Sequence, residues 1–157
     1  MTTTPLHPLP GSPGCVICDN NGTNPRSLKL RILWNEETKC VHIPCEPDES
    51  WCGYSSIVHG GLIASVLDEA MAWAVKQNTG DWAFTADCNL RFKQAVAPGA
   101  AYEVIAGVDQ VERRKITAHA DFLGPDGKVA ARAVATFLPS KGRAMPRSSR
   151  SGDGAES

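Results

Sequence analysis

The 157-residue sequence lacks the features that mark a nucleic-acid-binding or membrane protein. Its formal net charge is only −1, which gives no electrostatic reason to bind nucleic acid or an anionic membrane. The first residues have neither the basic start nor the apolar centre of a signal peptide. The one long apolar run carries two acids and is shorter than a membrane span. We therefore expect a cytoplasmic globular protein with no nucleic-acid or membrane partner.

Six cysteines are present, and without a secretory signal we interpret them as reduced thiols rather than disulfides. Two close pairs are also candidates for a four-thiolate zinc site: Cys15, Cys18, Cys40 and Cys45. Against zinc, Pro44 interrupts the second pair and His42 would compete as a ligand. Small buried thiols, with no metal and no cofactor, are the simpler expectation, and zinc at these four residues stays open.

The length suits one domain with a proper core and is too short for two. Residues 1–13 are rich in proline and threonine, and residues 141–157 are small, polar and basic. Such segments bury too little apolar surface to fold. We therefore predict disordered tails at 1–13 and 141–157, and a folded domain at 14–140.

The stretch from Ile57 to Gln77 predicts a buried helix. It opens with His59-Gly60-Gly61, and apolar residues then fill nearly every turn without proline or further glycine. Gly80 is the expected left-handed residue at its end. Asp68 lies midway along this helix, where an acid is costly unless it has partners or a function. We expect its neighbour Glu69 to face solvent or an interface.

Alternating apolar residues predict strands on both sides of the helix. Two precede it, at 28–34 and 39–43, and four follow it, at 84–93, 102–108, 116–122 and 128–138. The first strand after the helix puts Phe84, Ala86, Cys88, Leu90 and Phe92 on one face and Thr85 on the other. The turns are short, so the last four strands must form an antiparallel meander. The expected fold is α+β, with a curved antiparallel sheet wrapped around the helix and an exposed edge that invites a second copy.

The run His59-Gly60-Gly61, followed by Leu67-Asp68-Glu69-Ala70 on the central helix, resembles the hotdog-fold thioesterases. The closest branch is the PaaI-like, 4-hydroxybenzoyl-CoA thioesterase type, and the resemblance covers about residues 15–138. It implies hydrolysis of an acyl-CoA thioester to free acid and CoA by a homodimer or homotetramer.

The resemblance also implies roles for individual residues. The Gly60 amide would polarise the thioester carbonyl, and Asp68 would act as nucleophile or general base. Thr85 would help to orient the water or the acid, and His59 and Gly61 would contact the substrate. Family members often have Asn or Gln six residues before the motif histidine, where this chain has Gly53. A second donor to the carbonyl is therefore replaced or missing.

The residues themselves support this chemistry. A helix start presents free N–H groups, and glycines there leave room for a carbonyl oxygen. Gly60 and Asp68 are eight residues apart, or about 12 Å along a helix, too far for both to reach one carbon. We therefore predict a composite site in which Gly60 of one protomer faces Asp68 of its partner.

Other interpretations stay open. In one of them, His59 is no more than a helix cap or a core residue. In the same interpretation, Gly60 and Gly61 are present only to let the helix pack closely against the sheet. A non-catalytic acyl-CoA binding module has no need of Asp68. A hydratase for acyl thioesters needs a histidine and an acid that converge on the substrate. His59 precedes the helix and His119 lies on a predicted strand, so no such pair is evident.

Overall fold

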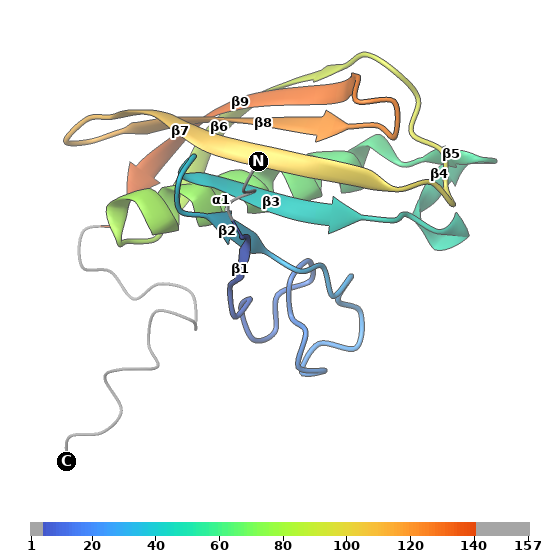
Figure 1. Cartoon of the computed structure of the whole chain (residues 1–157), viewed down its shortest axis with the longest axis horizontal. Coiled ribbons are helices and arrows are strands. Elements are labelled where there is room, and N and C mark those ends of the chain that lie inside the picture. Colours follow the sequence, from blue (N-terminus) through green and yellow to red (C-terminus); the bar gives the residue numbers. More distant parts are fainter. Residues whose placement is uncertain (1–4, 141–157) are drawn as a thin grey trace.

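The computed structural model describes residues 5–140. These residues form one long helix, a short 3-10 helix, a large sheet and a two-stranded ribbon (Figure 1). The elements are β1 (His7–Pro8), β2 (Leu33–Asn35), β3 (Cys40–Cys45), η1 (Glu49–Trp51), β4 (Cys52–Tyr54), β5 (Ile57–Val58), α1 (Gly60–Thr79), β6 (Ala83–Phe92), β7 (Tyr102–Val111), β8 (Ile116–Leu123) and β9 (Val129–Pro139). The predicted α+β class is confirmed.

The large sheet has seven antiparallel strands in the order β1-β2-β3-β7-β8-β9-β6. The last three strands pair with their chain neighbours, as the short turns predict. The predicted four-stranded meander is wrong for β6, because this strand pairs with β9 instead of β7. Strand β6 therefore forms one edge of the sheet, with ten residues whose outer side meets no other strand of the described chain. A long strand edge of this kind is open to pairing with another chain.

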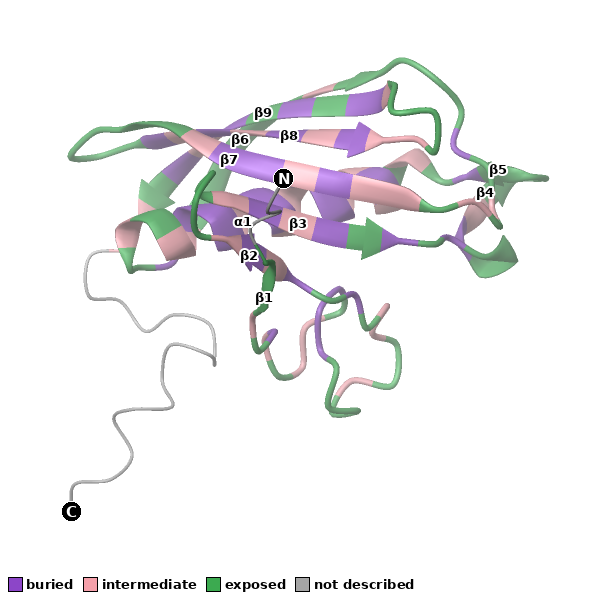
Figure 2. Cartoon of the chain, in the orientation of Figure 1, coloured by how far each residue is buried: buried purple, intermediate pink, exposed green. Residues whose placement is uncertain are grey.

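Helix α1 runs along one face of the sheet (Figure 1) and contacts β3, β6, β7, β8 and β9. Along β8 every second residue is buried, from Ile116 to Phe122, and these residues face the helix. Figure 2 shows the same alternation of buried and exposed residues on β9. Gly80 has φ 86° and ends the helix in the left-handed conformation, as predicted. In the part of the chain that the structure describes, no helix is long and apolar enough to cross a membrane.

The predicted strand at 28–34 is wrong for most of its length, because only Leu33–Asn35 pair in the sheet. Lys29 has a positive φ of 55°, which breaks an extended strand. Leu28 N and Leu30 N donate to Val16 O and Ile17 O at 2.8 and 2.9 Å. This segment therefore pairs with the loop that carries Cys15 and Cys18 rather than with a neighbouring strand.

The N-terminal segment is more ordered than the sequence predicts. Strand β1 pairs with β2, and Leu9 N donates to Ile32 O at 2.8 Å. Gly11 is buried, with φ 72°, and a Cβ there would lie 2.3 Å from Cys18 O. Residues 5–13 thus belong to the fold, because they cover the loop around Cys18. The predicted tail at 141–157 lies outside the described residues, and the boundaries of the domain stay a prediction.

Replacement of a helix residue that faces the sheet tests this packing. Leu67 is 0% exposed, so Leu67→Ala should lower the free energy of unfolding by about 2 to 5 kcal/mol through lost burial and a cavity. Leu6→Ala is the matched control, since Leu6 is 38% exposed and should cost under about 1 kcal/mol. Urea denaturation followed by circular dichroism measures both, and equal losses would contradict the burial of α1.

Candidate active site

His59 caps the start of helix α1. Its backbone is extended, and its Nδ1 atom accepts a hydrogen bond from Gly61 N at 2.8 Å. His59 O accepts from Leu62 N and Ile63 N at 3.0 and 3.3 Å. The capping role that the sequence left open is thus present, and it satisfies three of the amides in the first turn.

The Gly60 amide is the exception in this turn. Among the described residues, no acceptor is assigned to Gly60 N, while the three following amides all donate to His59. A Cβ at position 60 would lie 3.5 Å from the Phe92 ring. The space beside Gly60 is therefore bounded by an aromatic side chain and is not blocked by backbone from another segment. The positive end of the helix dipole therefore presents one free N–H group, which is what an oxyanion needs.

The structure gives a steric reason for glycine at position 53. A Cβ there would lie 2.9 Å from His59 Cδ2, closer than side-chain atoms normally approach. The His59 ring therefore lies directly beside the Gly53 backbone. His59 N also donates to Trp51 O at 2.8 Å, which holds the histidine against this loop. With the histidine in this position, Asn or Gln at position 53 would displace its ring.

Asp68 and Thr85 form a hydrogen-bonded pair, in which Thr85 Oγ1 donates to Asp68 Oδ1 at 2.7 Å. A bulge in β6 makes this contact: Thr85 pairs with Phe137 and Asp87 with Thr136, so Ala86 has no partner on β9. The single alternation predicted for β6 is therefore wrong, because the extra residue turns Thr85 toward the helix. Phe84, the residue before Thr85, is 49% exposed.

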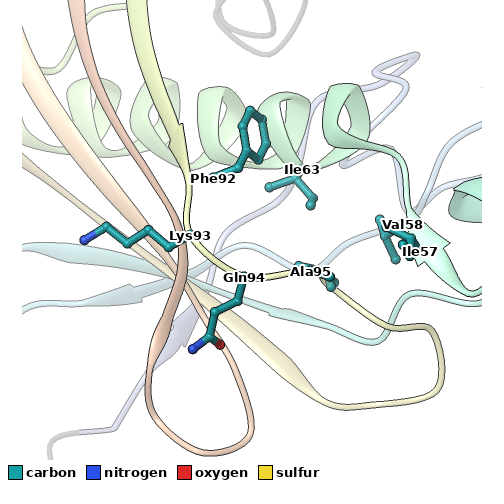
Figure 3. A pocket seen from close by; sticks show the side chains of 8 residues that line it. Ile57, Val58, Ile63, Phe92, Lys93, Gln94 and Ala95 are labelled. Atoms are coloured by element: carbon teal, nitrogen blue, oxygen red, sulfur yellow. The ribbon is translucent and has the colours of Figure 1, made fainter.

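Two cavities flank the edge strand β6, one at each of its ends. The first has a volume of about 300 Å³ and lies beside the helix start, with Ile57, Ile63 and Phe92 in its wall. Figure 3 shows that Phe92 and Ile63 approach one another from β6 and α1, whereas Lys93 and Gln94 extend away from them. Its lining is largely apolar, as expected of a site for an acyl chain or an aromatic group.

The second cavity contains the acid. It measures about 470 Å³, and Asp68, Thr85 and Phe84 line it together with Trp82 and Cys15. Both volumes are within the range of small-molecule sites. Within one protomer, the Gly60 amide is thus near the first cavity and the Asp68 carboxylate is in the second. The sequence did not indicate Trp82 or Cys15 for this site. Trp82 directly precedes β6, whereas Cys15 reaches the cavity from the distant N-terminal loop.

A cluster of three polar side chains adjoins the second cavity. Cys18 Sγ and Cys15 Sγ lie 2.8 and 3.5 Å from Glu69 Oε1, and Trp73 Nε1 donates to the same oxygen at 3.2 Å. Burial raises the pKa of Glu69 to about 7, and the hydrogen bond between the two thiols lowers the pKa of Cys15. Glu69 therefore faces the N-terminal loop and Trp73, which contradicts the expectation that it faces solvent, while the alternative of an interface position stays a prediction.

The structure does not assemble the four cysteines that the sequence proposed for zinc. Cys40 and Cys45 lie on β3, and neither joins the group of metal-ligating atoms formed by Cys15, Cys18 and Glu69 in the described chain. All six cysteines are free thiols. Burial raises the pKa of Cys45 to about 12, so this thiol stays neutral.

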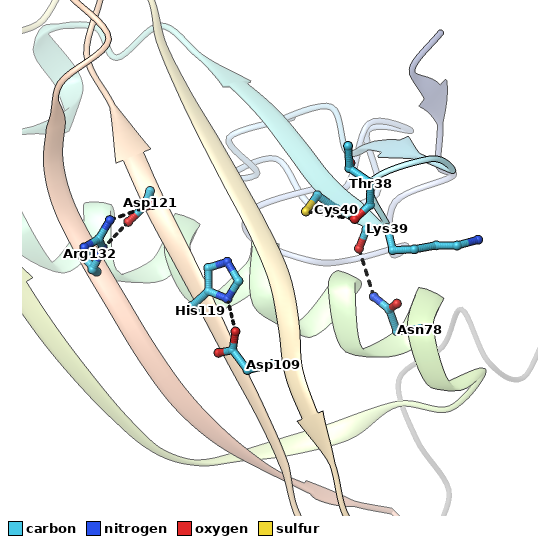
Figure 4. A network of polar contacts seen from close by, with 8 residues as sticks. All are labelled: Thr38, Lys39, Cys40, Asn78, Asp109, His119, Asp121 and Arg132. Carbon is cyan, nitrogen blue, oxygen red and sulfur yellow. Dashed lines mark hydrogen bonds and ion pairs between the residues drawn. The ribbon is translucent and has the colours of Figure 1, made fainter. Parts of the chain in front are cut away.

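A histidine–carboxylate pair is present, but it is not near the helix start. His119 Nδ1 lies 2.7 Å from Asp109 Oδ1 (Figure 4). His119 alternates on β8 with the buried residues Ala118 and Ala120, which face α1, so its side chain lies on the opposite face of the sheet. Arg132 and Asp121 form an ion pair that is drawn beside it in the same view. This arrangement disfavours the hydratase alternative, because His119 lies on the face of the sheet away from helix α1 and so does not approach Asp68.

Comparison with known proteins supports the architecture. A thioesterase superfamily protein aligns with a TM-score of 0.74 and 20% identity, over 80% of this chain and 60% of that one. A hypothetical thioesterase of Streptococcus pneumoniae, solved with coenzyme A, aligns with a TM-score of 0.62 and 16% identity, over 64% of this chain and 81% of that one. A variant of the phenylacetic acid degradation protein PaaI from Thermus thermophilus aligns with a TM-score of 0.59 and 21% identity, over 64% of this chain and 84% of that one. These likenesses define a hotdog fold.

Sequence comparison then gives the family. Residues 56–131 match the thioesterase superfamily, and this segment holds the helix start, Asp68 and Thr85. An uncharacterised protein of Schizosaccharomyces pombe is 31% identical over 101 residues, which are 60% of this chain and 58% of the relative. The chain thus matches less than two thirds of that relative's length. The chain thus has the hotdog fold, and its residues 56–131 match the thioesterase superfamily, as the sequence motif predicts.

The capping role of His59 makes a separate prediction about stability. His59→Ala leaves the Gly61 amide without its acceptor and should cost about 1 kcal/mol of unfolding free energy. Asn is a preferred cap, so His59→Asn should keep stability within about 0.5 kcal/mol of the wild type. Thermal and urea denaturation measure both variants. A fully stable His59→Ala protein would show that the ring does not hold the helix start.

Proposed function

We propose that the protein hydrolyses acyl-CoA thioesters to a free acid and CoA. The observation that carries this proposal is a pair of groups near the two ends of β6. One is the Gly60 amide, which has no hydrogen-bond acceptor among the described residues, and the other is the Asp68 carboxylate, which Thr85 holds by a hydrogen bond. The first is an oxyanion donor and the second is a nucleophile or general base. The match of residues 56–131 to the thioesterase superfamily supports the same reaction.

The reaction follows from these two groups. The thioester carbonyl oxygen accepts a hydrogen bond from Gly60 N, which polarises the carbonyl carbon. Asp68 takes a proton from water, and the resulting hydroxide adds to that carbon. The negative charge that develops on oxygen is stabilised by the Gly60 amide and the helix dipole. The carbon–sulfur bond then breaks, CoA leaves as its thiolate, and the proton held by Asp68 neutralises the sulfur.

Asp68 can also attack the carbonyl carbon directly, which gives a mixed anhydride and releases CoA; water then hydrolyses the anhydride. In both routes Thr85 has the same task. Its hydroxyl donates a hydrogen bond to Oδ1 of the carboxylate at 2.7 Å, which leaves Oδ2 for the reacting atoms. Thr85 is therefore a positioning residue.

The site is complete only in a dimer. Gly60 and Asp68 are about 12 Å apart along a straight helix, so one chain cannot supply both groups to one carbon. Within residues 5–140, no strand pairs with the outer edge of β6, and Phe92 at one of its ends is 52% exposed. A two-fold pairing of β6 with its copy, centred on the strand, sets Thr85 opposite Leu90 of the second copy. The acid cavity of one protomer then adjoins the helix-start cavity of the other.

The substrate class follows from the size and lining of these cavities. The helix-start cavity is largely apolar and suits an acyl or aryl group. The pneumococcal protein, which has a similar fold, was solved with coenzyme A, so CoA is the natural carrier to test. A panel of short, medium and aromatic acyl-CoA esters, assayed by release of the CoA thiol, defines the preferred acyl group.

Replacement of the acid separates an enzyme from a binding module. Asp68→Asn should lower kcat by about 10²- to 10⁴-fold, because a neutral amide cannot accept the proton of water. Affinity for a non-hydrolysable acyl-CoA analogue, measured by calorimetry, should be retained. Asp126→Asn, in the turn between β8 and β9, is the matched control and should keep full turnover. A wild-type protein that binds the analogue but releases no CoA would contradict hydrolysis.

The role of the Gly60 amide is tested by two substitutions at one position. Gly60→Pro removes the N–H group, while Gly60→Ala keeps it and adds a similar Cβ. Proline suits the first helical position, and His59 before it has ψ 128°, which a following proline allows. We expect Gly60→Pro to lower kcat by about 10²- to 10³-fold. Gly60→Ala should stay close to the wild type, and equal losses in both variants would contradict an oxyanion role.

Mixing these two inactive variants tests the composite site. A dimer with one Asp68→Asn chain and one Gly60→Pro chain holds one intact site, so full exchange should restore about a quarter of wild-type activity. Sedimentation of the same mixture reports whether dimers form. If both groups act within one chain, no activity returns, and an active monomer would contradict the proposal as well.

A further inference from the structure

The cluster of Cys15, Cys18 and Glu69 has no task in the hydrolysis. Its ligand atoms, two sulfurs and one carboxylate oxygen, all lie within 4.8 Å of one another. Cys18 is fully buried, and Cys15 and Glu69 are half-buried. The two thiols come from the N-terminal loop and the carboxylate from the middle of helix α1, so the cluster joins segments 51 residues or more apart in the chain.

The loop holds both sulfurs with backbone amides. Ile17 N donates to Cys15 Sγ at 3.3 Å, and Ser12 N donates to Cys18 Sγ at 3.2 Å. Asp19 holds the same loop from within, because its carboxylate accepts from Gly14 N at 3.0 Å and from Asn24 N at 2.7 Å. Amide donors to sulfur stabilise thiolates, which are the form that binds a metal.

The carboxylate is held in the same manner. Trp73 Nε1, one turn along the helix, donates to Glu69 Oε1 at 3.2 Å. A ligand that is itself oriented by a hydrogen bond from a neighbouring group is typical of metal sites. All three ligands of the cluster therefore have a fixed direction before any ion arrives.

The separations fit a small tetrahedral ion. A tetrahedral zinc ion, with Zn–S of about 2.3 Å and Zn–O of about 2.0 to 2.2 Å, holds its ligand atoms roughly 3.5 to 3.8 Å apart. The distance from Cys15 Sγ to Glu69 Oε1 is 3.5 Å, and that from Cys18 Sγ is 2.8 Å. The two sulfurs lie within 4.8 Å of each other, so shifts of about 1 Å in these side chains bring all three atoms to tetrahedral spacing. Calcium and magnesium take oxygen ligands and do not suit two sulfurs.

We propose that Cys15, Cys18 and Glu69 bind one zinc-class divalent cation. Two thiolates and one carboxylate carry three negative charges, and a divalent cation offsets two of them. Three protein ligands leave a fourth position for water, on the side where Cys15 lines the cavity of Asp68. The ion fastens the N-terminal loop to helix α1 next to Asp68, and so forms part of the wall of that cavity.

Metal analysis of the purified chain tests this site, independently of hydrolysis. The full-length protein is prepared without a metal-affinity column and without chelator, and zinc is counted by mass spectrometry. We expect about one zinc per chain, and cobalt in its place should give a thiolate-to-metal charge-transfer band. Cys15→Ser and Cys18→Ser should each abolish the band, and Glu69→Gln should weaken zinc affinity at least about tenfold.

Cys40→Ser is the matched control, since Cys40 is a half-buried thiol on β3 outside the cluster, and it should keep both zinc and the cobalt band. A wild-type chain that takes up no zinc from micromolar free Zn²⁺ would overturn the proposal. So would zinc retained after both cysteine substitutions, or zinc lost in Cys40→Ser. A Cys15–Cys18 disulfide in protein purified without oxygen would overturn it too, and the wild-type measurements stand even if a variant fails to fold.

Discussion

The burial of helix α1 against one face of the sheet is the constraint on which the other features depend. An apolar helix covered by five strands has a fixed direction, so its start and its acid lie at set points along β6. The separation of Gly60 and Asp68 therefore cannot change within one chain. The proposed site needs both groups and therefore spans the edge of β6, where the sheet of the described residues leaves a long strand without a partner on one side.

Two local irregularities prepare the reactive groups. His59 accepts from Gly61 and, through its carbonyl, from the next two amides, which leaves Gly60 N as the amide of the first turn without an assigned acceptor in the described chain. The bulge at Ala86 turns Thr85 toward the helix, where it bonds Asp68. A regular strand would have placed Thr85 on the outer face, and the carboxylate would lack this partner.

Adjacent helix residues serve different purposes because they point about 100° apart around the axis. Asp68 faces β6 and the cavity that Thr85 lines, whereas Glu69 faces the N-terminal loop and its two thiols. The helix thus carries the proposed reaction on one side and the proposed metal site on the other. Cys15 lines the cavity of Asp68 and is also a ligand of the proposed metal site. The loop that would hold the ion therefore also shapes the cavity of the acid.

The sequence by itself determined the features that depend on neighbouring residues. Helix formers and glycines defined where α1 begins and ends, short turns made the last strands antiparallel, and the spacing from His59 to Asp68 indicated the family. Only the tertiary structure decided the bulge at Ala86, the early break at Lys29, and the meeting of Glu69 with Cys15 and Cys18. These features arise from hydrogen bonds and packing between segments far apart in the chain, and no local pattern of residue types encodes such contacts.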